Sequence, residues 1–190
     1  NNNTVYNWHD AENWTPNGVP GSNDTAVIDY TGGAYRLMQV DDFAKVGALT
    51  VTGASAYLCV GCKATNNSKD IAAHTPLADV GEVGLDVCGN LEILNGGWLA
   101  VGGNLAPHAV SVNVGGDLTV SGGSAKLGVS AAADDEEDGS LYDATSVVTV
   151  GGRLTVAESG VIYPNANYKT GDSVEFVAGE IYVDETGSFN

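Results

Sequence analysis

A phrase of about fifteen residues recurs along this chain, and it constrains the fold more than any other feature. Each copy opens with a valine followed by small residues and a short apolar strand, as in VGGDLTVSGGSAKLGV. The copies are Val46–Val60, Val87–Val101, Val114–Val129, Val150–Tyr163 and Val177–Phe189. Self-similarity of this kind predicts a repeat architecture in which each unit stacks on its neighbours.

The apolar residues of the copies align in columns. A leucine or isoleucine lies four positions after the opening valine in four copies, and three positions after it in the first copy, and another apolar residue follows eight or nine positions later. The first column is Leu49, Leu91, Leu118, Leu154 and Ile181, and the second is Leu58, Leu99, Leu127, Ile162 and Phe189. Alternating apolar residues between glycine corners indicate short strands. The sequence therefore predicts an all-β, right-handed parallel β-helix of about five three-strand coils.

A β-sandwich is the competing fold. A two-residue corner such as Gly115-Gly116 could also close an antiparallel hairpin, which is the connection that sandwiches use. The aligned columns favour the β-helix, because identical positions of successive coils stack into continuous apolar ladders.

The spacing between copies varies, and the extra residues always follow the third strand. These insertions are residues 61–82, 102–109, 130–146 and 164–172. One edge of the solenoid is therefore expected to carry all the long loops, where repeat proteins often place binding or assembly functions. Tyr142, Tyr163 and Tyr168 are the aromatic residues expected on this edge, and they would favour carbohydrate binding.

The third insertion contains adjacent carboxylates that repel one another. Asp134, Asp135, Glu136 and Asp138 therefore favour either a solvated loop or a bound Ca²⁺, although the alternating order of an EF-hand loop is missing. Calcium is the one cofactor that the sequence suggests.

The chain is strongly acidic, with 24 Asp and Glu against 7 Lys and Arg and a formal net charge of -17. Nucleic acid binding needs a clustered positive surface, so a polyanionic partner is excluded. No apolar run is long enough to span a bilayer, so membrane insertion is not expected.

Three cysteines are present, of which Cys59 and Cys62 form a Cys-x-x-Cys pair and Cys88 lies at a corner of the next coil. In a secreted chain they predict one disulfide and one remaining thiol, with the pairing left open. A zinc site would need a fourth ligand, and the spacing matches no zinc ribbon or finger.

Residues 1–45 break the repeat and are predicted to cap the N-terminal end of the solenoid, while residues 46–190 form the repeats within one domain. The stretch YNWHDAENWTPNGVPGSNDTAVI is similar to the opening of bacterial extracellular β-helix proteins, including autotransporter passengers, and to the start of G8-type domains. The resemblance implies secretion and a β-helix, and no activity. By this resemblance the cap residues are Trp8, Trp14, Pro20, Gly21 and Asp24.

The last copy ends with its third strand, and no further segment is left to form a C-terminal cap. Ile181, Val183 and Phe189 are therefore expected at an open end, which is a template for pairing with another chain. The expected partner is a second copy stacked head to tail, or a neighbouring solenoid segment of a longer chain.

No catalytic constellation accompanies the fold. The outward column of the second strands contains Glu92 among threonines, which is a poor acid and base pair for glycoside chemistry. The leading hypothesis is a non-enzymatic, extracellular structural or surface protein that self-assembles into a fibre or layer. The alternatives are an adhesin or carbohydrate-binding module and, third, a fragment of a polysaccharide-degrading enzyme.

Overall fold

The computed structural model describes residues 4–62, 83–102, 110–131, 145–167 and 171–190. The strands of this part are β1 (Thr4–Asn7), β2 (Thr25–Asp29), β3 (Arg36–Val40), β4 (Phe43–Val46), β5 (Ala48–Thr52), β6 (Ala56–Val60), β7 (Val83–Val87), β8 (Leu91–Leu94), β9 (Trp98–Val101), β10 (Val110–Val114), β11 (Leu118–Ser121), β12 (Lys126–Ser130), β13 (Val147–Ala157), β14 (Val161–Asn165), β15 (Glu175–Val183) and β16 (Ser188–Phe189). A short 3-10 helix, η1 (Ala11–Asn13), is the one helical element among the described residues.

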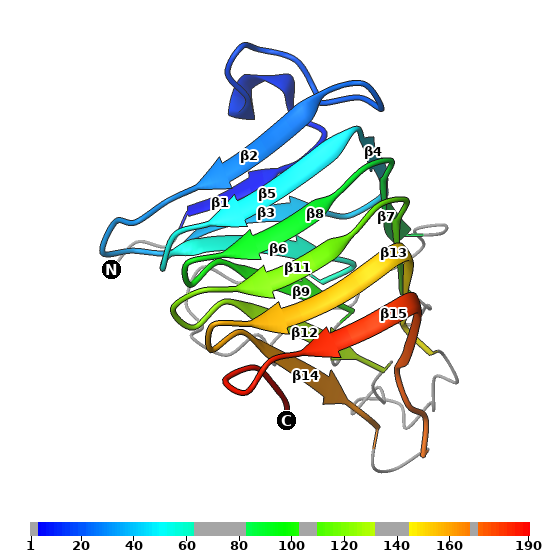
Figure 1. The fold of residues 1–190 in the computed structure, drawn as a ribbon. Coiled ribbons are helices and arrows are strands. Elements are labelled where there is room, and N and C mark those ends of the chain that lie inside the picture. The colour runs from blue at the N-terminus through cyan, green and yellow to red at the C-terminus, as the bar shows by residue number, and fades with distance from the viewer. Residues whose placement is uncertain (1–3, 63–82, 103–109, 132–144, 168–170) are drawn as a thin grey trace, which may run out of the picture.

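The strands stack into a parallel β-helix (Figure 1). One sheet has the order β1-β3-β6-β9-β12-β14-β16, and we call it face 3. The other sheet bends along its length, because β13 and β15 each continue around a corner. Its first part, face 1, contains β4, β7 and β10 with the first halves of β13 and β15. Its second part, face 2, contains β2, β5, β8 and β11 with the second halves of β13 and β15.

Every strand pair in the described part of the chain is parallel, and consecutive strands alternate between faces. The β-sandwich alternative is therefore wrong, since its hairpins require antiparallel neighbours. The five repeats form five stacked coils, from β4-β5-β6 to the coil made by β15 and β16.

The predicted apolar columns are confirmed by the register. Leu49 pairs with Leu91, Leu91 with Leu118, and Leu118 with Leu154, and all four side chains are buried in the interior. The shorter spacing in the first copy leaves this register unchanged. Burying one such side chain contributes about 1.5–3 kcal/mol, and a coil acquires this burial only when another coil lies on each side of it.

Side chains at the corner between faces 1 and 2 tie the coils together. Asn90 Oδ1 accepts a hydrogen bond of 3.0 Å from Asp117 N in the next coil, and Asp117 Oδ1 accepts one of 2.8 Å from Arg153 N. Asn90 and Asp117 each follow a pair of small residues at this corner. Their side chains therefore accept hydrogen bonds from backbone N–H groups of the next coil that would otherwise lack an acceptor.

The region predicted as a cap, residues 1–45, contains four strands that belong to the ladder. β2 pairs with β5, β3 with β6, β4 with β7, and β1 lies on β3. The segment from Trp8 to Asp24 lies outside the strands. This segment runs from β1 on face 3 to β2 on face 2. In the later coils, a strand of face 1 lies between these two faces.

The two tryptophans of this cap segment pack against each other and anchor it. Trp8 is fully buried, and its ring centroid lies 4.8 Å from that of Trp14 in an edge arrangement. Trp14 Nε1 donates a hydrogen bond of 2.8 Å to the carbonyl oxygen of Trp8, and Trp8 N donates to Gln39 O on β3. The cap segment is thus fixed to the first coils by its aromatic residues.

The four insertions connect face 3 to face 1 in every case, from β6 to β7, β9 to β10, β12 to β13 and β14 to β15. Each insertion therefore begins after a strand of face 3 and ends before a strand of face 1. No helix in the described part of the chain has the length and apolar character needed to cross a membrane.

Candidate functional site

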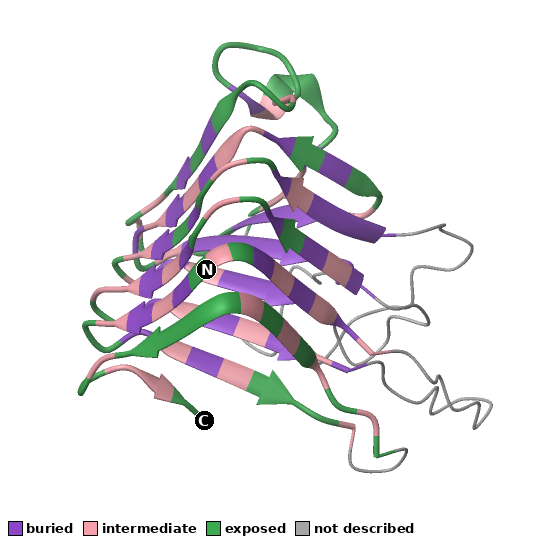
Figure 2. Cartoon of the chain, turned by 45° about the vertical axis from the view of Figure 1, so that its right-hand side comes forward, coloured by how far each residue is buried: buried purple, intermediate pink, exposed green. Residues whose placement is uncertain are grey.

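The last described coil carries an exposed apolar surface. β15 has no buried residue (Figure 2). Ile181 is 50% exposed, Val183 40% and Phe189 39%, whereas the residues that pair with them in the coil before, Leu154, Val156 and Ile162, are fully buried. The three residues predicted at an open end therefore lie together on one coil, as the last members of the interior columns.

Two aromatic rings partly close the interior at this end. Phe176, from the face 1 half of β15, and Phe189 of β16 meet edge to face with ring centroids 5.9 Å apart. The residues stacked before Phe176 are aliphatic from Ala44 to Val148, and those stacked before Phe189 are aliphatic from Leu58 to Ile162. The end of the solenoid is thus lined by larger apolar side chains than its middle.

The last coil is also acidic. Residues 171–190 contain no Lys or Arg and include Asp172, Glu175, Glu180, Asp184 and Glu185. Glu180 forms an ion pair within the chain, since its Oε2 lies 2.9 Å from Arg153 Nη2. The apolar end is therefore surrounded by negative charge.

Asp184 organises the last corner. Its carboxylate accepts hydrogen bonds from Glu158 N at 3.0 Å, from Thr186 N at 2.7 Å and Oγ1 at 2.8 Å, and from Gly187 N at 2.7 Å. These donors, with Glu158 N the largest contribution, lower the pKa of Asp184 to about 2. The Asp184 carboxylate therefore stays charged over the ordinary pH range.

A hollow of about 640 Å³ lies between the cap segment and strands β1, β2 and β3. One side of the hollow is lined by Tyr6, Ala26, Ile28 and Met38 from β1, β2 and β3, and the other by cap-segment residues that include Trp14. Ala26 is the first described member of the Leu49 column, and Tyr6 and Met38 are the first two described members of the Leu58 column. Ala26, Ile28 and Met38 are nevertheless buried, so the cap segment covers the interior columns beside the hollow.

A cation lies at the rim of this hollow. The Arg36 guanidinium carbon lies 4.2 Å from the ring centroid of Tyr30, in a cation–π contact. Tyr30 follows β2 at the corner between faces 2 and 3. This corner lies on the same edge of the solenoid as the Asp184 corner of the last coil (Figure 1).

The outward surface of face 3 carries a stack of aromatic rings from successive coils. The ring centroids of Tyr35 and Tyr57 are 5.4 Å apart, and those of Tyr57 and Trp98 are 4.5 Å apart. Lys126 Nζ lies 4.9 Å from the ring centroid of Trp98. Leu37 and the Cys59–Cys62 pair adjoin the rings and form a second apolar cluster outside the solenoid interior.

Burial raises the pKa of Tyr57 well above its ordinary value near 10, and the neighbouring Tyr35 adds to the shift. A tyrosine that ionises more easily in the unfolded chain contributes stability below about pH 10 and loses it as the pH rises further. We expect Tyr57→Phe to reduce the loss of stability between pH 9 and pH 11, as measured by urea unfolding. Tyr182→Phe is the control for removing a hydroxyl. If the stability of Tyr57→Phe depended on pH as that of the wild type does, burial would not raise the pKa of Tyr57 as proposed.

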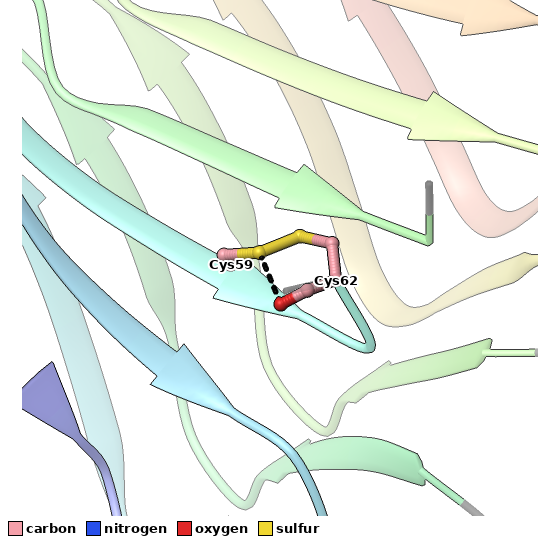
Figure 3. Close-up of a disulfide and its surroundings, with 2 residues drawn as sticks. All are labelled: Cys59 and Cys62. Atoms are coloured by element: carbon pink, nitrogen blue, oxygen red, sulfur yellow. Dashed lines mark hydrogen bonds between the residues drawn. A yellow bond between two sulfur atoms is a disulfide. The ribbon is translucent and has the colours of Figure 1, made fainter. Parts of the chain in front are cut away.

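The cysteines form one disulfide and one thiol. Cys59 and Cys62 are joined by the disulfide, with Cα atoms 5.6 Å apart (Figure 3). Cys88 is free and exposed. Cys59 Sγ also lies 2.8 Å from the carbonyl oxygen of Cys62. The bridge closes the turn at the end of β6, directly before the first insertion.

Most of the remaining predicted site residues fall in segments that the structure does not describe. Asp134, Asp135, Glu136 and Asp138 lie outside the described residues, as do Tyr142 and Tyr168. Tyr163 lies on β14, where it is half-buried and pairs with Gly128. The described residues contain no group of three or more His, Cys, Asp or Glu side chains that could hold a metal ion. The calcium and loop-edge sites stay predictions.

The outward column of face 2 runs through Val27, Thr50, Glu92, Thr119, Thr155 and Tyr182. Glu92 is the one carboxylate of this column. Its described partner is the Thr50 hydroxyl, which donates a hydrogen bond of 3.3 Å to Glu92 Oε2. An acid and base pair needs two carboxylates across a substrate, and this column supplies one.

Sequence reasoning missed two features of the surface, the N-terminal hollow and the aromatic stack. The stack had a signal, because Tyr57 and Trp98 occupy the position before the buried leucine of the third strand in successive copies. The hollow had none, since its walls come from segments that are distant in sequence. The chain matches no protein-family model, no curated protein and no solved structure.

Proposed function

We propose that this chain is a non-enzymatic structural or surface protein of the extracellular space, which assembles head to tail through its last coil. The observation that carries the proposal is the exposed apolar surface that Ile181, Val183 and Phe189 form on the last described coil. A parallel strand edge with an apolar inner side is the surface on which the solenoid itself adds each successive coil.

The expected gain in free energy on association is appreciable. Each of these side chains is about half exposed, so that covering it contributes on the order of 1 kcal/mol. The backbone groups on the free edge of β15 gain strand partners in addition. Association must exceed the loss of translational and rotational freedom, which is why a complete coil is needed as the partner surface.

Two further features support an extracellular location. The disulfide between Cys59 and Cys62 is typical of oxidising compartments. The cap sequence around Trp8 and Trp14 resembles the openings of secreted bacterial β-helix proteins, and in this chain the segment packs over the first coils.

Sedimentation velocity and light scattering over a range of protein concentrations test the assembly. The wild-type protein is expected to form particles that lengthen with concentration. Ile181→Asp is expected to remain a monomer, because it places a charge inside the joint. The control is Thr119→Asp, an outward residue of the middle of face 2. A wild-type protein that stays monomeric at every concentration would refute the proposal, as would an Ile181→Asp protein that assembles normally.

A carbohydrate-binding module is the second candidate, favoured by the partly exposed rings of Tyr35 and Trp98 at the ends of the aromatic stack. Sugar rings pack on aromatic faces through apolar C–H surfaces, so these rings provide the platform. A glycan array with wild-type protein and with Trp98→Ala tests this candidate. Binding that Trp98→Ala abolishes supports it, and the absence of any bound glycan counts against it.

A further inference from the structure

We infer that the hollow between the cap segment and strands β1, β2 and β3 binds a neutral sugar, such as the terminal unit of a glycan, with Arg36 and Asp29 as its hydrogen-bonding anchors. The inference goes beyond head-to-tail assembly and does not depend on it, because no residue of the last coil lines the hollow. The hollow is also separate from the aromatic stack of face 3, since neither Tyr57 nor Trp98 lines it.

The hollow has the size and the fixed walls of a small-molecule site. Its volume of about 640 Å³ lies within the range of about 300–1,000 Å³ that such sites occupy. The cap segment is held by hydrogen bonds from Trp14 Nε1 to the carbonyl oxygen of Trp8, at 2.8 Å, and from Gly18 N to that of Ala11, at 3.1 Å. The opposite wall consists of strands that are paired in the ladder. A ligand therefore enters a preformed site, and little ordering of the protein opposes binding.

Polar side chains from three elements line the hollow with unused hydrogen-bonding capacity. Asn17 comes from the cap segment, Asp29 from the end of β2 and Arg36 from the start of β3. The side chains of Asn17 and Asp29 have no hydrogen-bond partner among the described residues, and Arg36 forms no ion pair with any of them. The set contains both donors and acceptors. It therefore matches hydroxyl groups, which donate and accept in turn.

The Tyr30 ring restricts the Arg36 side chain. The guanidinium carbon lies 4.2 Å from the ring centroid, in a cation–π contact that uses none of the N–H donors in a hydrogen bond. Asp29 is the residue directly before Tyr30, so a donor and an acceptor adjoin the same ring. Arg36 and Asp29 are thus preorganised to bind neighbouring hydroxyl groups of one sugar.

Apolar surface in the hollow suits the C–H groups of a sugar ring. Tyr6 and Tyr30 contribute half-buried aromatic rings. Val19 of the cap segment is 40% exposed and Val27 of β2 is 56% exposed, and both line the hollow. A pyranose presents C–H groups on its faces and hydroxyl groups around its edge, so that one ring uses both kinds of lining.

Other classes of ligand fit the same lining less well. An acidic ligand would meet the carboxylates of Asp24 and Asp29 in the hollow, together with a chain of net charge -17. A lipid tail would bury Arg36 and Asp29 without hydrogen-bond partners, which is unfavourable. A neutral polyhydroxyl ring avoids both penalties.

Titrations with the methyl glycosides of glucose, galactose, mannose and N-acetylglucosamine, followed by ligand-observed NMR, test the site. The wild-type protein is expected to bind at least one of them, and to bind methyl glucuronide more weakly than methyl glucoside. Arg36→Ala and Asp29→Ala are each expected to weaken binding about tenfold or more, the effect of losing a hydrogen bond to a charged group. Both side chains are exposed, so both variants are expected to fold, and circular dichroism checks this.

Lys45→Ala and Glu92→Ala are the matched controls, because they remove the same charges from strands that do not line the hollow. Both are expected to bind the glycoside as wild type does. The inference is overturned if no glycoside binds, if methyl glucuronide binds more tightly, or if the controls weaken binding as much as Arg36→Ala. Binding that is lost in Trp98→Ala but kept in Arg36→Ala would overturn it too, and would place the sugar on the aromatic stack.

Sedimentation velocity separates this site from the proposed assembly. Arg36→Ala is expected to assemble as wild type does while its sugar binding is weakened. A wild-type protein that binds the glycoside but stays monomeric would refute the assembly and support the site. A wild-type protein that assembles but binds no glycoside would refute the site alone.

Discussion

Replacing Leu118 by alanine is expected to lower the free energy of unfolding by about 3 kcal/mol, within the range of large-to-small core substitutions. Leu118 is fully buried in the middle of its column, between Leu91 and Leu154 in the adjacent coils. Removing the side chain leaves a cavity that both neighbours line. Urea unfolding followed by circular dichroism measures the change.

Two matched variants separate this effect from a general loss of side chain. Thr119→Ala lies on the same strand and points outward, so its effect should stay within about 0.5 kcal/mol. Ile181→Ala lies at the exposed end of the same column and should cost about 1 kcal/mol, because half of its side chain is already in water. Equal losses for Leu118→Ala and Ile181→Ala would contradict the stacked interior.

Gly160→Ala is expected to lower the free energy of unfolding by about 2–3 kcal/mol, in the range of overpacking substitutions. Gly160 is buried at the corner before β14, and a Cβ atom there would collide with the carbonyl oxygen of Val120 in the coil above. The obstacle is backbone within the ladder, so that the coils must separate locally to admit a methyl group.

Gly33→Ala is the control for this substitution. Gly33 lies at an exposed corner, and a Cβ atom there would have no neighbour within 4 Å. Its stability should change by less than about 0.5 kcal/mol. A Gly160→Ala protein as stable as Gly33→Ala would show that the corners tolerate separation, against the close packing of the coils.

The fold was largely predictable because its signal is both local and repeated. A residue such as Leu118 alternates with polar neighbours inside its own strand, and the same alternation recurs at Leu91 and Leu154. Parallel stacking then follows from repetition alone, since identical positions must lie over one another. The insertion edge was predictable for the same reason, because the spacing between copies shows where chain is added.

The boundary of the cap was less accessible to sequence reasoning. β2 and β3 lack the Gly-Gly corners of the later copies, yet they pair in register with β5 and β6. Strand pairing depends on which edges meet in space, and the local sequence of one strand does not identify its partner. The disulfide partner of Cys59 was undetermined for a similar reason, since Cys62 and Cys88 both lie within reach along the chain.

The amino-acid sequence by itself determined the coil, its inward columns and the edge that carries the insertions, because each follows from period-two alternation and glycine corners within one repeat. Only the tertiary structure decided which members of a column are exposed. Ile181 and Leu118 occupy the same place in their repeats, yet one is half exposed and the other buried. The physical reason is that burial in a solenoid is conferred by the neighbouring coils, so the last described coil differs from the middle while its local sequence does not.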